Sequence, residues 1–161
     1  MEIKARTNCF FMPNWSSIGA MEAVKRTSGI ADGLFSWAAW PWGNTDGNTY
    51  VDASYEDYLL RAGGKAYMMP VSPWFYTNMP GFDKNWLWRG KSYFFLYALY
   101  DADNLIGDDL WRDRWEQVLW VKPDYVQIIS WNDYGESHHI GPLRSGTYEA
   151  FGEKFGNSPF K

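Results

Sequence analysis

The residues with the clearest chemical potential lie together between positions 130 and 142. Asp133 and Glu136 stand three positions apart, with a tyrosine and a glycine between them, directly after an apolar run over 125–130 that predicts a buried strand. Polar side chains at the end of a buried strand are costly to desolvate, so we expect this cluster to line a cleft that solvent reaches. Two carboxylic acids in one cleft can serve as general acid and general base, most familiarly on glycosidic bonds. The alternative is a solvated loop whose acids cap the following helix.

Two adjacent histidines, His138 and His139, follow the acids and raise the alternative of a metal-dependent hydrolase. Neighbouring side chains of an extended segment point to opposite sides, so both imidazoles can hardly bind one ion. We therefore prefer a hydrogen bond from one imidazole to a catalytic acid, and we expect neither a metal nor another cofactor.

Aromatic residues make up 20% of the chain, with 11 Trp, 11 Tyr and 10 Phe. One core needs fewer, so some indole rings must reach a surface or cleft, where flat aromatic faces stack on the apolar faces of sugars. The candidates for substrate binding lie beyond predicted strands or beside the acids: Trp15, Trp37, Trp40, Trp74, Tyr76, Trp131, Asn132, Tyr134 and His138. The alternative is that about half of the strand-end tryptophans pack within the fold.

The bulk properties of the sequence exclude several classes of partner. A net charge of -4 without a cluster of Lys or Arg argues against nucleic acid and against an anionic membrane surface. No apolar run has the length of a membrane span, and the first residues lack the pattern of a secretory signal. A length of 161 residues predicts a single domain.

Strands and helices are expected to alternate along the chain. Near-continuous apolar runs over 8–12, 33–37, 66–71 and 125–130 predict parallel strands that are covered on both faces. Helical spacing predicts three helices whose apolar faces comprise Ile18, Met21 and Val24; Val51, Tyr55, Tyr58 and Leu59; and Trp111, Trp115, Val118 and Leu119. The expected class is α/β, with about four βα units of a (β/α)8 barrel, a fold that usually needs about 250 residues.

The sequence resembles the fungal α-1,3-glucanases, or mutanases, of glycoside hydrolase family 71 from about residue 8 to about residue 150. The matching blocks are Cys9–Ser17, Asp32–Gly43, Lys65–Gly81, Lys84–Gly90, Asp108–Leu119 and Ile129–Pro142, of which the last is the most specific. The resemblance implies the second half of a barrel, an α-glucan polysaccharide as substrate, and an enzyme that is secreted or bound to the cell wall. It also implies that Asp133 and Glu136 are the catalytic pair and that hydrolysis inverts the anomeric carbon.

Inversion requires a protonated carboxyl for the leaving oxygen and an ionised one that activates water, about 6.5–9.5 Å apart. We expect Glu136 to be the acid, because its longer side chain stands near His138 and Tyr134, and Asp133 to be the base. The reverse assignment is the alternative. A different function is that of a non-catalytic glucan-binding remnant, because half a barrel would lack part of the site.

Residues 91–107 have no counterpart in the family, which passes directly from a block like Trp86–Gly90 to one like Asp108–Trp111. We interpret this segment as an insertion without site residues, consistent with a retained intron, because its ends can be encoded with splice signals and its excision keeps the frame. The alternative is a functional lid. Half a barrel also leaves two edge strands without partners, which predicts self-association.

Overall fold

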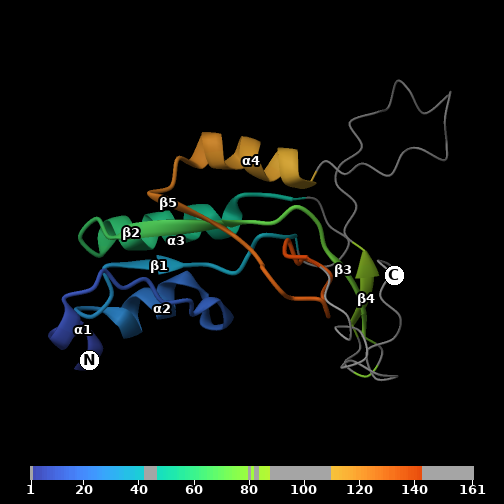
Figure 1. Ribbon diagram of the computed structural model, residues 1–161. Coiled ribbons are helices and arrows are strands. Elements are labelled where there is room, and N and C mark those ends of the chain that lie inside the picture. Colours follow the sequence, from blue (N-terminus) through green and yellow to red (C-terminus); the bar gives the residue numbers. More distant parts are fainter. Residues whose placement is uncertain (1, 42–46, 80, 82–83, 88–109, 143–161) are drawn as a thin grey trace, which may run out of the picture. The chain divides into compact units, whose positions relative to one another are not determined.

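The computed structural model describes residues 2–41, 47–79, 81, 84–87 and 110–142 (Figure 1). The elements in chain order are α1 (Glu2–Thr7), the 3-10 helix η1 (Ser16–Ile18), α2 (Gly19–Thr27), β1 (Gly33–Phe35), α3 (Tyr50–Arg61), β2 (Ala66–Val71), β3 (Tyr76–Met79), β4 (Lys84–Leu87), α4 (Leu110–Val121) and β5 (Tyr125–Ile128). The segment 91–107 lies outside the described residues. None of the described helices is long and apolar enough to cross a bilayer.

The chain divides into two compact units, and each is described by itself. The first comprises residues 1–39, 48–70 and 116–127, and the second comprises residues 40–47, 71–115 and 128–161. The first unit carries most of the small parallel sheet, and the second carries the candidate site.

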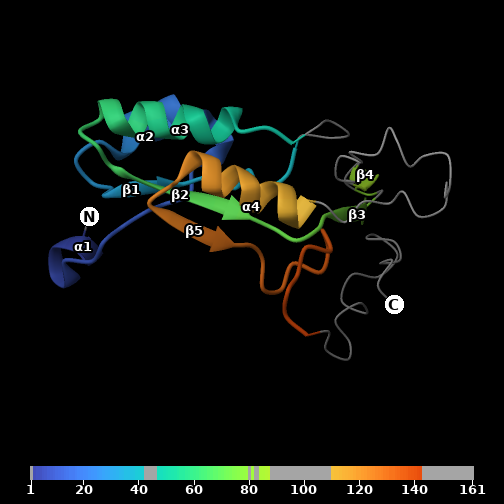
Figure 2. The ribbon, with the colours of Figure 1, turned by 90° about the horizontal axis from the view of Figure 1, so that it is seen from above.

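The parallel sheet has the strand order β1-β2-β5. Gly33, Leu34 and Phe35 of β1 are all buried and pair in parallel with residues 66–68 of β2. Gly33 is required there, because a Cβ would stand 2.3 Å from the carbonyl oxygen of Ala66. The helices α2 and α3 pack side by side, and α3 contacts β1 (Figure 2). These elements confirm the predicted α/β class.

A buried polar network also holds α3 to the sheet. Tyr67 of β2 donates a hydrogen bond from its hydroxyl to Asp52 Oδ1 of α3 at 2.7 Å. The same hydroxyl lies 2.9 Å from Ser36 Oγ, at the end of β1. All three side chains are almost completely buried. A buried carboxylate is tolerated here because it accepts a hydrogen bond inside the core.

The prediction of a strand over 8–12 is wrong. That segment forms no ladder, although it runs beside β1: Asp32 donates its backbone N–H to Phe11, Phe35 donates to Pro13, and Asn14 forms an isolated parallel bridge with Phe35. Proline has no N–H to donate to a neighbouring strand. The segment therefore follows β1 in an extended conformation without regular pairing.

The predicted helices exist, but their buried faces are shifted. The buried residues are Ala20, Ala23 and Thr27 of α2, Asp52, Tyr55 and Leu59 of α3, and Leu110, Arg114 and Val118 of α4. By contrast, Met21 is 59% exposed, Val51 43% and Leu119 73%. A shift of one residue turns a helix by about 100°. The apolar spacing thus fixes the helical period, whereas packing selects the face, including positions where polar side chains are buried.

The expectation that every strand is covered on both faces fails for β5. The last three residues of β2 are buried, whereas Tyr125 and Ile128 of β5 are 46% and 44% exposed. Within the described residues β5 pairs only with β2 and so forms an edge of the sheet. Edge strands leave backbone groups and side chains open to solvent or to a further strand.

The second unit contains an antiparallel hairpin that the sequence analysis did not predict. Strands β3 and β4 pair from Tyr76 with Leu87 to Met79 with Lys84. The apolar-run criterion missed them because this region mixes aromatic, amide and charged residues. The hairpin matters for the site because its first residue contacts the acidic loop.

Candidate active site

The candidate site is a closed loop that follows β5. Ile129 donates its backbone N–H to Val71 at 2.9 Å, which continues the pairing beyond β5. The chain then folds back on itself: Ser130 donates its backbone N–H to the carbonyl of His138 at 3.0 Å, and Ile140 donates to the carbonyl of Ser130 at 2.8 Å. These two hydrogen bonds join Ser130 to His138 and Ile140, so residues 132–137 form the loop between them (Figure 1).

Both acids of the loop converge on one imidazole. The Nε2 atom of His138 lies 3.3 Å from Asp133 Oδ2 and 3.3 Å from Glu136 Oε2. The His138 side chain is completely buried, while the Asp133 and Glu136 side chains are 39% and 20% exposed. The predictions that solvent reaches the acids and that one histidine is their hydrogen-bond partner agree with this geometry.

Asp133 does not cap a helix, as the competing interpretation proposed, because no helix follows it within the described residues. Its Oδ1 instead accepts a hydrogen bond from the backbone N–H of Glu136 at 3.0 Å and so stabilises a turn. The other oxygen of the same carboxylate faces His138. The turn fixes the Glu136 backbone relative to Asp133, so the three-residue spacing places both acids beside one ring.

Electrostatics distinguish the two histidines. Burial lowers the pKa of His138, but hydrogen bonds and charge attraction from Asp133 and Glu136 outweigh it, so that its pKa is raised above the ordinary value of 6.5. Burial, together with repulsion from His138, lowers the pKa of His139, against a smaller opposing effect of Asp133. The His139 ring packs instead on Tyr134, with centroids 4.6 Å apart. The two imidazoles thus face different partners.

Three side chains of the loop could bind a cation. One oxygen each of Asp133 and Glu136 and a ring nitrogen of His138 lie within 4.8 Å of one another. Without a cation, the same three atoms can form hydrogen bonds in which the imidazole N–H donates to the two carboxylates. The expectation that no metal is needed stays a prediction.

An aromatic wall encloses His138. The Trp40 ring lies 4.4 Å from the imidazole, centroid to centroid, and Phe75 stacks on it at 5.9 Å with an interplanar angle of 17°. Trp40 and Phe75 also contact each other at 5.2 Å, and Trp40 Nε1 donates to the carbonyl of Trp74 at 3.1 Å. Trp40 therefore packs against His138, as the alternative for the strand-end tryptophans predicts.

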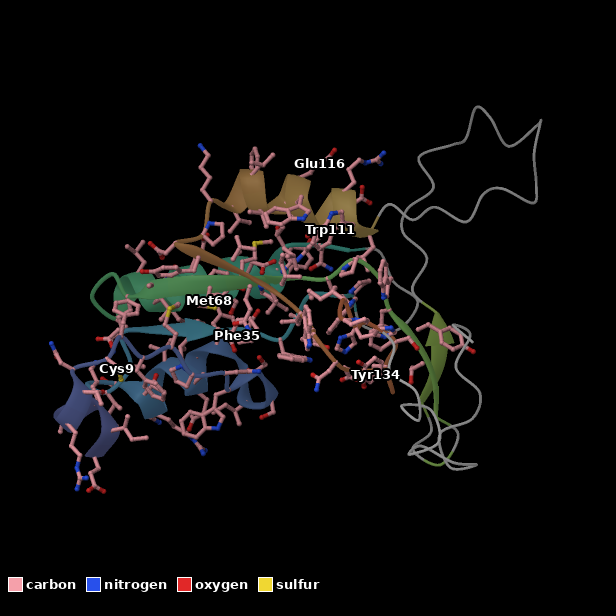
Figure 3. The ribbon with its side chains drawn as sticks, viewed as in Figure 1. Cys9, Phe35, Met68, Trp111, Glu116 and Tyr134 are labelled. Carbon is pink, nitrogen blue, oxygen red and sulfur yellow. The ribbon has the colours of Figure 1, made fainter. Side chains whose placement is uncertain are left out.

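Trp74, Tyr76, Asn132 and Tyr134 are further predicted binding residues of the second unit. Tyr76 donates its backbone N–H to the Glu136 carbonyl at 3.3 Å. Tyr134, which is labelled in Figure 3, donates its hydroxyl to the Pro142 carbonyl at 3.1 Å. Trp74 is 45% exposed, and Asn132 is exposed as well. These positions leave polar and aromatic side chains available to a ligand beside the loop.

Trp131 has the geometry of a platform. Its side chain is 62% exposed, and Gly141 packs against it: a Cβ on Gly141 would lie 3.0 Å from the indole and 2.6 Å from the Trp131 carbonyl oxygen. The Gly141 backbone N–H donates to that carbonyl at 2.9 Å. One part of the ring is thus supported by bare backbone, while the rest is open to stack on a sugar.

Trp15 and Trp37 belong to the first unit and are 41% and 38% exposed. Arg26 lies 6.0 Å from the centre of the Trp15 ring. Trp37 packs edge-on against Phe35 at 5.9 Å and donates its backbone N–H to Ser16 Oγ at 2.7 Å. Their predicted role in substrate binding stays a prediction.

Three residues of the site escaped the sequence analysis: Ser130, Phe75 and Gly141. Ser130 Oγ lies 3.0 Å from His138 Nδ1 and accepts the backbone N–H of Asp133 at 3.0 Å. A serine three positions before an aspartate carries little signal by itself. The glycine-proline pair at 141–142 indicates a turn, but not the contact with Trp131.

We expect Gly141→Ala to weaken substrate binding. The new methyl group would overlap the Trp131 carbonyl and indole, so the ring must shift or the loop must open. Stacking of one ring on a planar face is worth about 1–3 kcal/mol in related systems, which predicts a KM increase of about 5- to 100-fold. Steady-state kinetics on soluble oligosaccharides measure this, and an unchanged KM would contradict the platform. Gly63→Ala in the first unit is the control for a general loss of stability, because its φ of +99° strains the new side chain although nothing lies within 4 Å of it.

Comparison with known proteins identifies relatives of the chain. A glucan endo-1,3-alpha-glucosidase of Schizosaccharomyces pombe is 40% identical over 135 residues, which is 84% of this chain and 26% of the relative. A mutanase of Penicillium rubens is 40% identical over 127 residues, 75% of this chain and 24% of the relative. An ascus wall endo-1,3-alpha-glucanase of S. pombe is 33% identical over 138 residues, 86% of this chain and 27% of the relative.

The chain spans about a quarter of the length of these relatives. No solved structure matches it. The family model described as "Glycosyl hydrolase family 71" matches residues 1–161, which is the whole of the printed sequence. The acidic loop with its two carboxylates is consistent with this match. The chain belongs to glycosyl hydrolase family 71.

Proposed function

We propose that this chain is part of a glycoside hydrolase that cleaves α-1,3-glucan. The observation that carries the proposal is the convergence of Asp133 and Glu136 on His138, in a loop whose acids are partly exposed. Membership of family 71 and the names of the three relatives support the choice of substrate. Exposed aromatic rings at Trp131 and Trp74 suit a polysaccharide partner.

For the catalytic roles we propose Glu136 as general acid and Asp133 as general base. Glu136 is the more buried of the two carboxyls, which favours its protonated form. Asp133 is more open to the solvent from which the attacking water comes. His138 then keeps the two side chains oriented, and the buried aromatic wall shields it from water.

The spacing of the acids constrains the stereochemistry. One oxygen of each carboxylate lies within 4.8 Å of the other, whereas inversion usually needs about 6.5–9.5 Å between the carboxyls and retention about 5–5.5 Å. We retain inversion and infer that substrate and water separate the two side chains in the productive complex. Asp133 is the more exposed of the two side chains, and we expect it to be the one that moves.

The anomeric form of the first product tests this function. The whole enzyme of which this chain is a part, incubated with α-1,3-glucan oligosaccharides, should release new reducing ends in the β-configuration, followed by proton NMR before mutarotation. Release of the α-anomer would contradict inversion and favour retention. Absence of any hydrolysis would contradict the proposed activity.

We also propose that the fold is part of a (β/α)8 barrel in a single catalytic domain, with residues 91–107 as an insertion. The parallel order β1-β2-β5, with the acidic loop directly after β5, supports the barrel. The exposed edge at β5 supports self-association of this chain when no further strand covers it. Sedimentation at increasing concentration would detect such association.

We propose the cell wall as the site of action, by analogy with the ascus wall relative.

We expect chelators to leave activity unchanged. If Asp133, Glu136 and His138 act through hydrogen bonds and proton transfer, catalysis requires no divalent cation, and removal of such ions leaves the rate unchanged. Hydrolysis rates before and after exhaustive treatment with EDTA, and after addition of zinc or calcium, provide the measurement. Strong inhibition that is reversed by one of these ions would favour the metal-dependent alternative at the three ligand atoms.

A further inference from the structure

We propose that Ser130 is a positioning residue of the active site, whose hydroxyl keeps the His138 Nε2 atom protonated and directed at Asp133 and Glu136. The inference deepens the proposed function and rests on it for the catalytic role of the two acids. The position of the hydrogen on the His138 ring does not depend on that function and can be measured directly.

One hydrogen bond of the Ser130 side chain has a fixed direction. The backbone N–H of Asp133 can only donate, and it lies 3.0 Å from Ser130 Oγ. The serine oxygen is therefore an acceptor in this bond. A hydroxyl has one hydrogen and two acceptor lone pairs, so one hydrogen and one lone pair are left for its second partner.

That second partner is the imidazole. Ser130 Oγ lies 3.0 Å from His138 Nδ1. When the imidazole is neutral, the two carboxylates beside Nε2 favour the ring hydrogen at that atom, and the serine hydroxyl then donates to the bare Nδ1. When the imidazole is protonated, both nitrogens carry hydrogen and Nδ1–H donates to the remaining lone pair of the serine. The Nε2–H is present in both cases.

The hydrogen on Nε2 matters because this atom faces the two acids. Nε2 faces Asp133 Oδ2 and Glu136 Oε2, both at 3.3 Å. An N–H at this position donates to the two carboxylates, whereas a bare nitrogen lone pair would repel them. Loss of the serine hydroxyl would remove the donor to the bare Nδ1, which weakens the preference for the Nε2–H form and makes the other tautomer more accessible.

The connection is also mechanical. Ser130 is tied through its backbone to both ends of the loop, because its N–H donates to His138 and its carbonyl accepts from Ile140. Through its side chain it holds the Asp133 backbone and the His138 ring at once. A single residue therefore sets the base, the imidazole and the loop closure in one geometry, while it has no contact of its own with the acidic oxygens among the described hydrogen bonds.

The test measures the imidazole first and catalysis second. Long-range proton–nitrogen NMR of the full chain labelled with ¹⁵N-histidine reports which ring nitrogen carries hydrogen. We expect wild-type His138 to be protonated on Nε2 across the pH range in which the protein is folded. A His138 that carries hydrogen on Nδ1 alone would overturn the proposal, and this result needs no variant and no activity.

Ser130→Ala should then show a mixture of tautomers at His138 and a kcat about tenfold lower, with KM within about twofold of wild type. Ser130→Thr keeps the hydroxyl and should restore both readouts, and it also serves if the alanine variant fails to fold. Ser137→Ala is the matched control, since Ser137 is a buried serine of the same loop without a hydrogen bond to His138. Unchanged tautomers in Ser130→Ala, or an equal loss in Ser137→Ala, would overturn the assignment.

The two proposals fail in different ways. If wild type does not hydrolyse glucan but His138 behaves as expected, the proposed function is wrong and the role of Ser130 in setting the tautomer stands. If wild type is active and Ser130→Ala keeps both its tautomer and its kcat, the function stands and the role of Ser130 is wrong.

Discussion

Asp133→Asn and Glu136→Gln should each lower the rate of α-1,3-glucan hydrolysis by several orders of magnitude, about 10²–10⁴-fold, in the full chain. The amides keep the shape of the acids but can neither activate water as a base nor deliver a proton. Because the loop contacts of the backbone are unchanged, glucan binding should persist, so the loss should appear in kcat rather than in KM. Initial rates and a glucan pull-down measure the two quantities.

Asp57→Asn is the matched control for the carboxylate substitutions. Asp57 is an exposed acid of α3 in the first unit, paired with Arg61 at 3.0 Å, and its neutralisation should leave the rate unchanged. Near-normal turnover in Asp133→Asn or in Glu136→Gln would remove that residue from the mechanism. If both variants stay active, the cluster is structural and the catalytic carboxyls lie elsewhere.

His138→Phe should lower kcat by about a hundredfold, equal to about 2.7 kcal/mol of transition-state stabilisation. The phenyl ring keeps the stacking on Trp40 and Phe75 but removes the Nε2–H that both carboxylates share. Without this donor the two acids lose their fixed orientation. His139→Phe is the control, because that imidazole packs on Tyr134. Equal losses in the two variants would contradict a specific role for His138.

The same pair of variants should show opposite effects of pH on stability. The folded-state pKa of His138 is raised, so its stabilising contribution is complete below the ordinary value of 6.5 and is lost as the pH rises through the folded value. The pKa of His139 is lowered, so its contribution is present above 6.5 and is lost as the pH falls. Denaturant unfolding at about pH 6 and about pH 9 compares the variants with wild type. A parallel response of both variants would contradict these directions.

The strands and helices follow from local patterns in the sequence where one interaction dominates. The run over 66–71 predicts β2 with both of its ends, because six apolar residues leave no alternative to a buried strand. The segment 8–12 looks equally apolar but precedes Pro13, whose missing N–H interrupts pairing with β1. Local hydrophobicity therefore finds an apolar extended segment, whereas a ladder also requires that the segment itself offers backbone N–H donors to its neighbour.

The faces of the helices could not be predicted in the same way. Apolar spacing gives the period of α2, but the structure buries Ala20 and Ala23 and leaves Met21 exposed. Small side chains let two helices approach closely, and that advantage depends on the neighbour, α3. Likewise Asp52 is buried only because Tyr67, fifteen positions away, supplies a hydrogen bond.

At the site, the printed sequence was enough to identify the family and to predict the chemistry: two acids stand three residues apart, beside histidines, in a block typical of family 71. Tertiary structure decided which imidazole serves the acids, that Ser130 holds it, and that Gly141 supports Trp131. The physical reason is that residue type fixes what a side chain can donate, accept or stack upon, while its partner depends on a loop closure between residues 130 and 140 that no local pattern encodes.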